Sequence, residues 1–325
     1  MEKNSSIFNF KRQLPYGFLV ALLLVICIEG GLAIVFRHHI GQGYIRTTFG
    51  RLSEIDNLKP SSKIRVVLLG DSLAMGIDGP QANPLVLNLS TNWWLSMAGQ
   101  YFILKKTFDQ GLRPELCVVI SSTSLWGNNF DTRSNLKAGD GYFFRPFASW
   151  DNIFELCFDA KRPDLAWRMI VKGLIPSAHF NKEMLALLIG DRLIDKPKIA
   201  INPRIREQNI KSFILRNPST VSKLAKFYFR KICDLCRKNN TKLVILEAYI
   251  PESRFTAEVN HKAIIEEMEG VAKANDDVVV AFVNRKFIFP DSFFKTDGVH
   301  LADEAAKREF RDGVYKIIEA YLLAE

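Results

Sequence analysis

Short apolar runs that alternate with helical patterns constrain the fold of this chain more than any other feature. The residues KIRVVLLG at 63–70 form a continuous, β-branched apolar run, which is typical of a strand buried on both faces of a sheet. Four further runs have the character of strands, at 85–89, 116–120, 242–246 and 278–283. Helical patterns lie between or after these runs, at 95–108, 257–274 and 303–323. Strands that alternate with helices predict a parallel sheet covered on both faces.

We therefore expect an α/β fold, a flavodoxin-like three-layer sandwich, because right-handed crossovers place helices on both faces of a parallel sheet. The alternation is interrupted by an aromatic-rich and proline-containing stretch over about 126–220. We expect a mostly helical insertion there, which is either a lid or substrate wall over a site or a packing subdomain. Ligands of such folds bind at the carboxyl ends of the strands, so residues directly after a strand are the first candidates for a site.

A long apolar segment precedes this domain. Residues 14–36 contain 18 apolar residues and a single charge, Glu29. About 20 apolar residues span the ~30 Å hydrocarbon core of a bilayer, so the segment predicts an N-terminal transmembrane helix; a buried core helix is the alternative. The expected organisation is a short cytoplasmic tail (1–13), the anchor (14–36), a linker (37–62) and an exported domain (63–325).

Two short motifs carry candidate chemistry. GDSL at 70–73 follows the first predicted strand, and DGVH at 297–300 precedes the last predicted helix. A serine hydroxyl becomes a nucleophile when an imidazole accepts its proton, and a carboxylate fixes the tautomer of that imidazole. We therefore predict Ser72 as the nucleophile, His300 as the general base and Asp297 as the carboxylate that orients it. Each motif alone has a plainer interpretation as a capped turn, and their joint occurrence favours catalysis.

With these two motifs the chain resembles the SGNH, or GDSL-type, superfamily of esterases and acyltransferases. The resemblance implies the flavodoxin-like fold and the same three catalytic roles. In that superfamily a glycine and an asparagine complete the oxyanion hole. Here the glycine position falls on Trp93, or on Ser90 in a shifted register, and Thr123 stands at the asparagine position. These three residues are the oxyanion candidates, with the asparagines at 128 and 129 as other possible donors. One such donor contributes about 2.7–4 kcal/mol to a transition state elsewhere.

The predicted anchor narrows the resemblance to membrane-anchored proteins of the bacterial envelope, including those of polysaccharide O-acetylation and teichoic-acid D-alanyl transfer. It implies a serine acyl-ester enzyme, an O-acyltransferase or esterase, that acts on a cell-envelope glycan or polymer. It also implies a single-pass protein of the inner membrane whose domain faces the periplasm or cell exterior, and a multi-spanning membrane O-acyltransferase as a partner. The alternative is a non-catalytic scaffold of the same fold that binds such a partner, which the incomplete oxyanion set favours.

The net charge of +9 is concentrated in one strip. Residues 192–238 contain thirteen Lys or Arg and three acids, a net charge of +10, so the rest of the chain carries −1. For an exported domain this strip favours an anionic lipid surface or an anionic glycan polymer as a partner, rather than nucleic acid. An ordinary solvated helix face is the alternative.

Metal and cofactor chemistry has no support in the sequence. The pair C-x-x-C at 233–236 lies within a helical pattern, which predicts a helix face rather than a zinc or redox site. No histidine spacing suggests a metal site, and no glycine-rich nucleotide motif occurs. We therefore expect neither a metal nor a cofactor.

Overall fold

The computed structural model describes the chain in several stretches, and the statements below concern these residues. They are 10–39, 55–59, 63–77, 83–91, 96–127, 150–159, 161, 163, 202–216, 220–256 and 259–322. In the N-terminal helix, side chains are described for residues 16–31.

Five parallel strands form the central sheet. They are β1 (Val66–Gly70), β2 (Val86–Asn88), β3 (Leu116–Ser121), β4 (Lys242–Glu247) and β6 (Val279–Val283). Their order across the sheet is β2-β1-β3-β4-β6, and each neighbouring pair is parallel. Numbered along the chain this order is 2-1-3-4-5, which is the order of flavodoxin-like sheets. The predicted α/β fold with a parallel sheet is confirmed.

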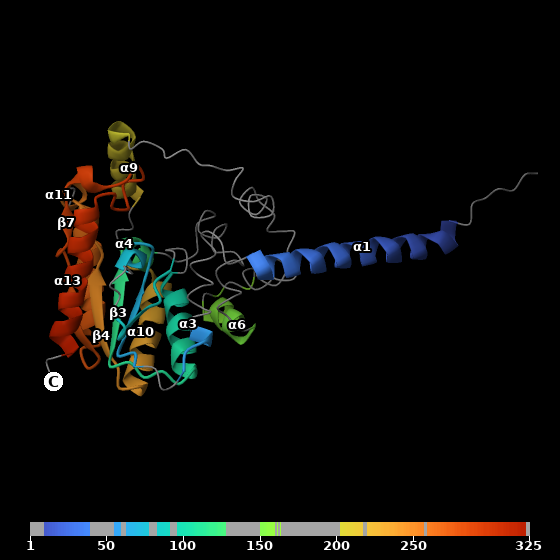
Figure 1. The fold of residues 1–325 in the computed structure, drawn as a ribbon, viewed down its shortest axis with the longest axis horizontal. Helices are drawn as coiled ribbons and strands as arrows, with labels where there is room; N and C mark the ends of the chain where they lie inside the picture. The colour runs from blue at the N-terminus through green and yellow to red at the C-terminus, as the bar shows by residue number, and fades with distance from the viewer. Residues whose placement is uncertain are drawn as a thin grey trace, which may run out of the picture.

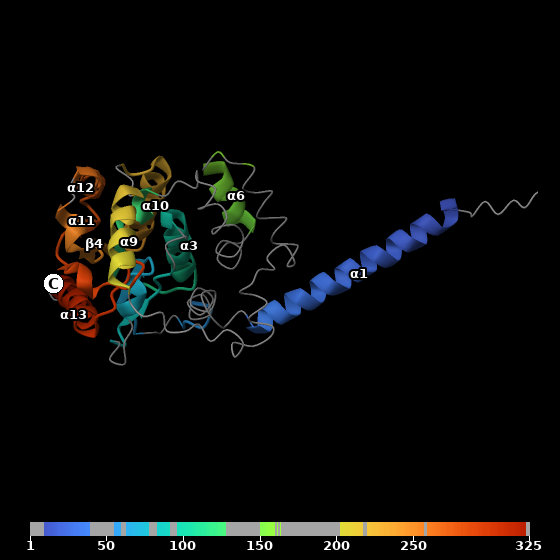
Figure 2. The ribbon, with the colours of Figure 1, turned by 90° about the horizontal axis from the view of Figure 1, so that it is seen from above.

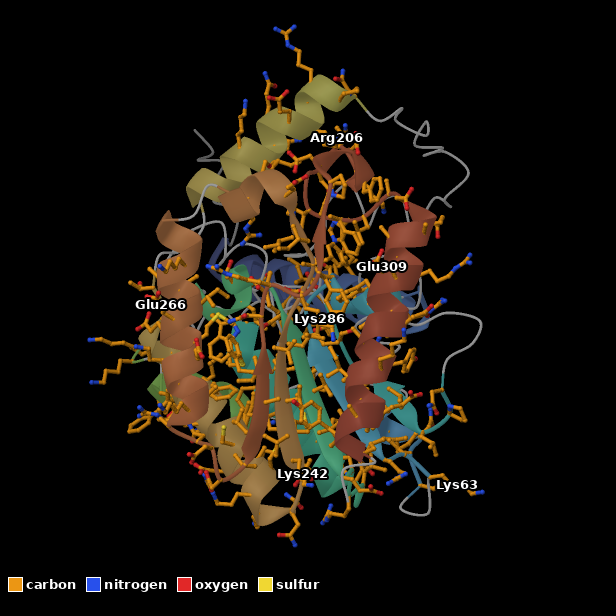
Figure 3. The ribbon with its side chains drawn as sticks, turned by 90° about the vertical axis from the view of Figure 1, so that its left-hand side faces the viewer. Lys63, Arg206, Lys242, Glu266, Lys286 and Glu309 are labelled. Atoms are coloured by element: carbon orange, nitrogen blue, oxygen red, sulfur yellow. The ribbon has the colours of Figure 1, made fainter. Side chains whose placement is uncertain are left out.

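Helices cover both faces of the sheet. One apolar core joins strand residues such as Val67 and Val119 to helices α3 (Ser96–Asp109), α10 (Lys223–Lys238) and α12 (Val259–Lys273). A second core joins the intervening strand residues, such as Leu68 and Val118, to helix α13 (Glu304–Leu322). Successive strand residues point to opposite faces, so a strand between two helical layers is apolar at every position. Figure 1 shows α10, and Figure 3 shows α12, on the face of the sheet opposite to α13.

Short elements continue several strands at the carboxyl edge of the sheet. The helical turn η1 (Ala74–Ile77) follows β1, and α4 (Thr123–Gly127) follows β3. Beyond β4 and β6, strands β5 (Ile250–Pro251) and β7 (Ile288–Phe289) pair in a small second sheet. The remaining elements there are α11 (Glu252–Thr256) and η5 (Asp291–Phe293).

Two helices of the predicted insertion are described, and they occupy different places. Helix α6 (Trp150–Asp159) is held to the side of the domain by Lys231 of α10, whose ammonium lies 2.6 Å from Glu155 and 2.8 Å from Asp159. Helix α9 (Pro203–Arg216) lies over the carboxyl ends of the strands, as Figures 2 and 3 show. The insertion therefore contributes one helix to lateral packing and another to the edge where ligands bind.

The N-terminal segment forms one long helix, α1 (Phe10–His39). Large apolar side chains along it are exposed, among them Phe18 at 68%, Leu23 at 59% and Ile28 at 59%. This excludes the alternative of a helix buried in the core of the domain. Among the residues that the structure describes, no helix has both the length and the apolar character needed to cross a membrane, so the predicted transmembrane span is unsupported.

Candidate active site

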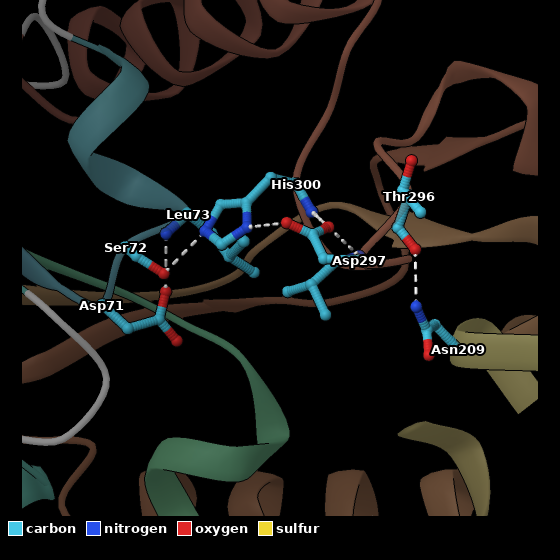
Figure 4. Close-up of polar contacts among 8 residues, drawn as sticks. Asp71, Ser72, Leu73, Asn209, Thr296, Asp297 and His300 are labelled. Atoms are coloured by element: carbon cyan, nitrogen blue, oxygen red, sulfur yellow. Dashed lines mark hydrogen bonds and ion pairs between the residues drawn. The ribbon is translucent and has the colours of Figure 1, made fainter. Parts of the chain in front are cut away.

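The three predicted catalytic residues come together at the carboxyl edge of the sheet. Ser72 lies in the turn after β1, and Asp297 and His300 lie in the loop between η5 and α13. His300 Nε2 is 3.0 Å from Ser72 Oγ, and His300 Nδ1 is 2.9 Å from Asp297 Oδ2 (Figure 4). The serine and the histidine are 228 residues apart in sequence. The contacts have the connectivity of a Ser-His-Asp triad, in which one ring nitrogen faces the nucleophile and the other faces the carboxylate.

The loop around Asp297 explains how a four-residue motif holds a histidine in place. Asp297 Oδ1 accepts hydrogen bonds from the backbone N–H groups of Val299 and His300, both at 2.9 Å. This closes a tight turn that brings the imidazole back onto Oδ2 of the same carboxylate. Burial alone would raise the pKa of Asp297, but the hydrogen bonds from the His300 ring and from the two backbone groups lower it to about 2. The carboxylate is therefore ionised at neutral pH and favours a proton on Nδ1, which leaves Nε2 as an acceptor.

The turn before Ser72 depends on a glycine. Gly70 has a φ of +155°, and a Cβ built there would lie 2.0 Å from the carbonyl oxygen of Ile120 on the neighbouring strand. Because that oxygen belongs to the backbone of β3, it cannot move aside as a flexible side chain would. The motif therefore needs glycine at this position for the close approach of two strands.

Gln100 holds the same peptide from α3. Its Oε1 accepts from the Gly70 N–H, and its Nε2 donates to the Gly70 carbonyl, both at 2.9 Å. The side chain is fully buried, so both ends of the amide are used in a site without access to water. Gln100 was not among the predicted site residues. In the sequence it is an uncharged polar residue inside an apolar helical stripe, and it belongs to no motif of distinctive spacing.

The side chain of Asp71 joins the turn that carries Ser72 to the end of β3. Its Oδ1 accepts from the backbone N–H of Leu73 at 3.0 Å. Its Oδ2 accepts from the backbone N–H and the hydroxyl of Ser122, at 3.0 and 2.6 Å. The carboxylate is 1% exposed, and three donors compensate for its lost hydration. Asp71 thereby connects the carboxyl ends of β1 and β3 beside Ser72.

The oxyanion candidates have different positions. Both donors of Ser90 are used by Asn88, whose Oδ1 accepts from the Ser90 N–H at 3.0 Å and from its hydroxyl at 2.5 Å. Ser90 thus stabilises the turn after β2 and offers neither donor to a substrate. Trp93 lies outside the described residues, as do the asparagines at 128 and 129. Thr123 is buried at the start of α4, directly after the residue that binds Asp71.

A buried arginine, absent from the sequence prediction, contacts Thr123. Arg254 Nη2 donates to Thr123 Oγ1 at 2.5 Å, and the Arg254 side chain is 4% exposed. Burial lowers the pKa of Arg254 to about 10, against the effect of the carboxylates of Glu247 and Asp71, so the guanidinium is charged at neutral pH. It places a cation close to the carboxyl ends of β3 and β4. Arg254 lies on a five-residue helix, where no periodicity or motif distinguishes it from a surface arginine.

The cysteines of β3 and α10 belong to the core. Cys117 of β3 and Cys233 and Cys236 of α10 are all buried and free. Burial raises the pKa of the Cys233 thiol, and for Cys236 a hydrogen bond with Cys117 acts first in the same direction, followed by burial. The thiols of Cys233 and Cys236 are therefore protonated and lack thiolate reactivity. In the described part of the chain, no group of three or more His, Cys, Asp or Glu residues could hold a metal ion.

The described side chains have the arrangement that nucleophilic catalysis uses, because a hydroxyl, an imidazole and a carboxylate are connected in series. Ser72 is half-buried, and the side chain of His300 is 29% exposed, so both side chains reach the surface of the described part of the chain. Comparison with protein-family models, with curated proteins and with solved structures finds no match for this chain.

Proposed function

We propose that the protein is a serine acyl-ester enzyme, an esterase or an O-acyltransferase. The observation that carries this proposal is the pair of contacts on His300, 3.0 Å to Ser72 Oγ and 2.9 Å to Asp297 Oδ2. These side chains come from two loops far apart in the chain, and a shared structural role does not require this alignment. A scaffold would need neither the nucleophile nor the base in place.

In the proposed reaction, Ser72 Oγ attacks the carbonyl carbon of an acyl ester while His300 Nε2 accepts the hydroxyl proton. Asp297 stabilises the imidazolium that forms and keeps the ring aligned. The tetrahedral intermediate collapses, and His300 returns its proton to the departing alcohol, which leaves an acyl group on Ser72. Water or an acceptor hydroxyl then repeats the attack on the acyl-enzyme, with His300 again as the base. The acceptor decides between hydrolysis and transfer.

The negative charge on the intermediate requires donors near Ser72. The backbone N–H of Ser72 follows the Gly70 turn and is the first candidate. Thr123 is the second, because its Oγ1 already accepts from the guanidinium of Arg254, which leaves the hydroxyl proton to donate elsewhere. A hydroxyl that accepts from a cation becomes a stronger donor. This pair would take the place of the asparagine that the resemblance calls for.

Membrane attachment through α1 also stays a proposal. It is supported by the 18 apolar residues among positions 14–36 and by the exposed apolar side chains of this helix. On this basis we place the protein at the bacterial inner membrane, with its domain on the outer side. An envelope glycan or polymer as substrate, a membrane O-acyltransferase as partner and an anionic lipid or polymer at residues 192–238 are further proposals. Retention of the full chain in the pellet after alkaline carbonate extraction tests the attachment.

A fluorophosphonate probe tests the enzymatic proposal, because it reacts with a serine only when a base activates the hydroxyl. The full-length protein should label, and Ser72→Ala and His300→Ala should not. Ser292→Ala is the matched control, since this exposed serine lies in η5 close to the catalytic loop and should leave labelling unchanged. Mass spectrometry should locate the adduct on Ser72. If the unmutated protein stays unlabelled with the triad intact, the scaffold becomes the better interpretation.

A further inference from the structure

One helix of the insertion contacts the loop that carries two members of the triad. Asn209 of α9 donates from Nδ2 to the carbonyl oxygen of Thr296 at 2.7 Å, directly before Asp297 (Figure 4). Arg206, one turn earlier on the same helix, donates to the carbonyl oxygen of Ser292 at 3.0 Å. Two side chains of α9 thus bind two backbone carbonyls of the segment that leads into the catalytic loop.

The backbones of α9 and the loop also touch. Gly298 has a φ of +70°, and a Cβ built there would lie 2.7 Å from Ile210 Cγ1 and 2.8 Å from the Ile210 backbone nitrogen. Ile210 is itself 2% exposed. The glycine of the DGVH motif therefore has two functions: it permits the left-handed turn, and it allows the loop to lie against α9.

The helix is well defined where it makes these contacts. Pro203 occupies its first turn, and Asn202 Oδ1 accepts from the backbone N–H groups of Arg204 and Ile205, at 3.1 and 3.2 Å. An asparagine cap followed by proline is a strong start for a helix. The contact residues lie on successive turns after this cap, so they face the loop together.

The internal bonds of the loop set its shape, and α9 restrains its position. Within the loop, the Lys295 N–H donates to the His300 carbonyl at 2.7 Å, and the Gly298 N–H donates to the Lys295 carbonyl at 2.9 Å. Both bonds lie within the loop, so they move with it and hold it together as one structural unit. Ser72 lies in a different unit, the turn after β1. The 3.0 Å contact between the two units requires external restraint of the loop, and α9 supplies such restraint at both Thr296 and Gly298.

We propose that α9 is the positioning element of the catalytic loop and that Asn209 is its positioning residue. The Thr296 carbonyl and the Asp297 nitrogen share one peptide plane, so the amide of Asn209 fixes the plane from which the Asp297 side chain projects. Loss of this bond lets the plane rotate, which lengthens the contacts from Asp297 to His300 and from His300 to Ser72. The insertion thereby becomes part of the catalytic apparatus. This inference rests on the proposed function for its kinetic consequence.

The kinetic test compares variants of the full-length protein by their fluorophosphonate labelling rate. Asn209→Asp keeps the size of the side chain but removes the donor, and Asn209→Ala removes the amide. Each should label about tenfold more slowly under conditions in which the protein is folded. A tenfold change in rate corresponds to a change of about 1.4 kcal/mol in the activation free energy. Gln208→Ala is the matched control, because this neighbouring side chain is exposed on the same helix. A labelling rate within twofold of the unmutated protein in both Asn209 variants would overturn the proposal.

A spectroscopic test does not depend on activity. With ¹⁵N-histidine label, the Nδ1 proton that His300 shares with Asp297 should resonate at low field, and the His300→Ala variant identifies the signal by its loss. Both Asn209 variants should move this resonance upfield, whereas Gln208→Ala should leave it in place. An unchanged resonance would show that Asn209 does not act through Asp297. If the unmutated protein fails to label, the proposed function fails, and the resonance alone then decides the role of Asn209.

Discussion

Removal of the Gln100 amide should destabilise the domain and slow the reaction of Ser72, although Gln100 is not a member of the triad. In Gln100→Ala the Gly70 N–H loses its acceptor, while the Gly70 carbonyl retains the Thr91 N–H at 3.0 Å. A buried donor without a partner costs about 1–3 kcal/mol, and loss of the second bond costs about 0.5–1.5 kcal/mol. The expected loss is therefore about 2–4 kcal/mol, which is a large fraction of an ordinary folding free energy of about 5–15 kcal/mol.

This loss can be measured as a shift of the thermal unfolding midpoint. Domains of about 150–250 residues shift by about 2–4 °C per kcal/mol, so the midpoint should fall by about 5–15 °C. Buried Trp126 gives an intrinsic fluorescence signal for the transition. Gln110→Ala is the control, because this exposed glutamine lies just beyond the end of α3. The labelling rate of Ser72 should fall in Gln100→Ala under conditions in which the protein is still folded.

A third variant separates hydrogen bonding from packing. Gln100→Met has a similar side-chain length and fills the space, but it makes neither bond with Gly70. If the two bonds are responsible, Gln100→Met should remain at least 2 °C less stable than the unmutated protein, a conservative lower bound for a loss of about 1 kcal/mol or more. A Gln100→Met protein as stable as the unmutated one would refute the hydrogen-bond argument. So would equal midpoints for Gln100→Ala and Gln110→Ala.

Further predictions concern pH and two glycines. Because the pKa of Asp297 falls from 3.8 to about 2 on folding, its stabilising contribution is complete above about pH 4 and disappears as the pH drops towards 2. The unfolding midpoints of the unmutated protein and of Asp297→Asn should therefore converge over this range, and a constant difference would contradict the assignment. In α12, Gly270→Ala should stabilise the protein by up to about 1 kcal/mol, since nothing lies within 4 Å of the new Cβ. In α13, Gly313→Ala should destabilise it by about 1 kcal/mol, because a Cβ there lies 2.5 Å from the buried Phe287 ring and overpacking outweighs the gain in helix propensity. Denaturant unfolding should show changes of opposite sign in the free energy of unfolding for these two glycine variants.

The strands could be located from the sequence because each is buried on both faces. The runs at 116–120 and 242–246 correspond closely to β3 (Leu116–Ser121) and β4 (Lys242–Glu247). Such strands are apolar at every position, so local composition alone marks them. The short edge strand β2 (Val86–Asn88) was predicted two residues too long, since one neighbour restrains it instead of two.

The triad was also accessible from the sequence, for a different reason. Its chemistry requires specific residue types, and both motifs directly adjoin elements that the apolar pattern identifies. Their proximity followed from the fold, because the carboxyl ends of parallel strands lie at one edge of the sheet. The oxyanion candidates were less predictable. Whether the donors of Ser90 are free depends on Asn88, and the environment of Thr123 depends on Arg254, which is 131 residues away in sequence.

The basic strip shows how tertiary contacts change a charge pattern. Among the residues of the strip that the structure describes, three cations pair with acids outside residues 192–238: Lys226 with Glu267, Lys231 with Glu155 and Asp159, and Arg237 with Asp277. These bridges reduce the local excess of positive charge that the sequence suggested, and they fasten α10 to α6 and to the segments around α12 and β6. A partner that binds by charge alone would therefore experience a weaker electrostatic field than the net charge of +10 implies.

Local apolar pattern and side-chain type were enough to locate the five strands of the central sheet and to select the candidate residues for nucleophilic chemistry. Which side chains hold these candidates in place follows only from the tertiary structure. Gln100 on the nucleophile turn, Arg254 at Thr123 and Asn209 at the catalytic loop all act through hydrogen bonds to residues at least thirty positions away. Such bonds depend on the relative placement of whole elements, and no local pattern in the sequence encodes that placement.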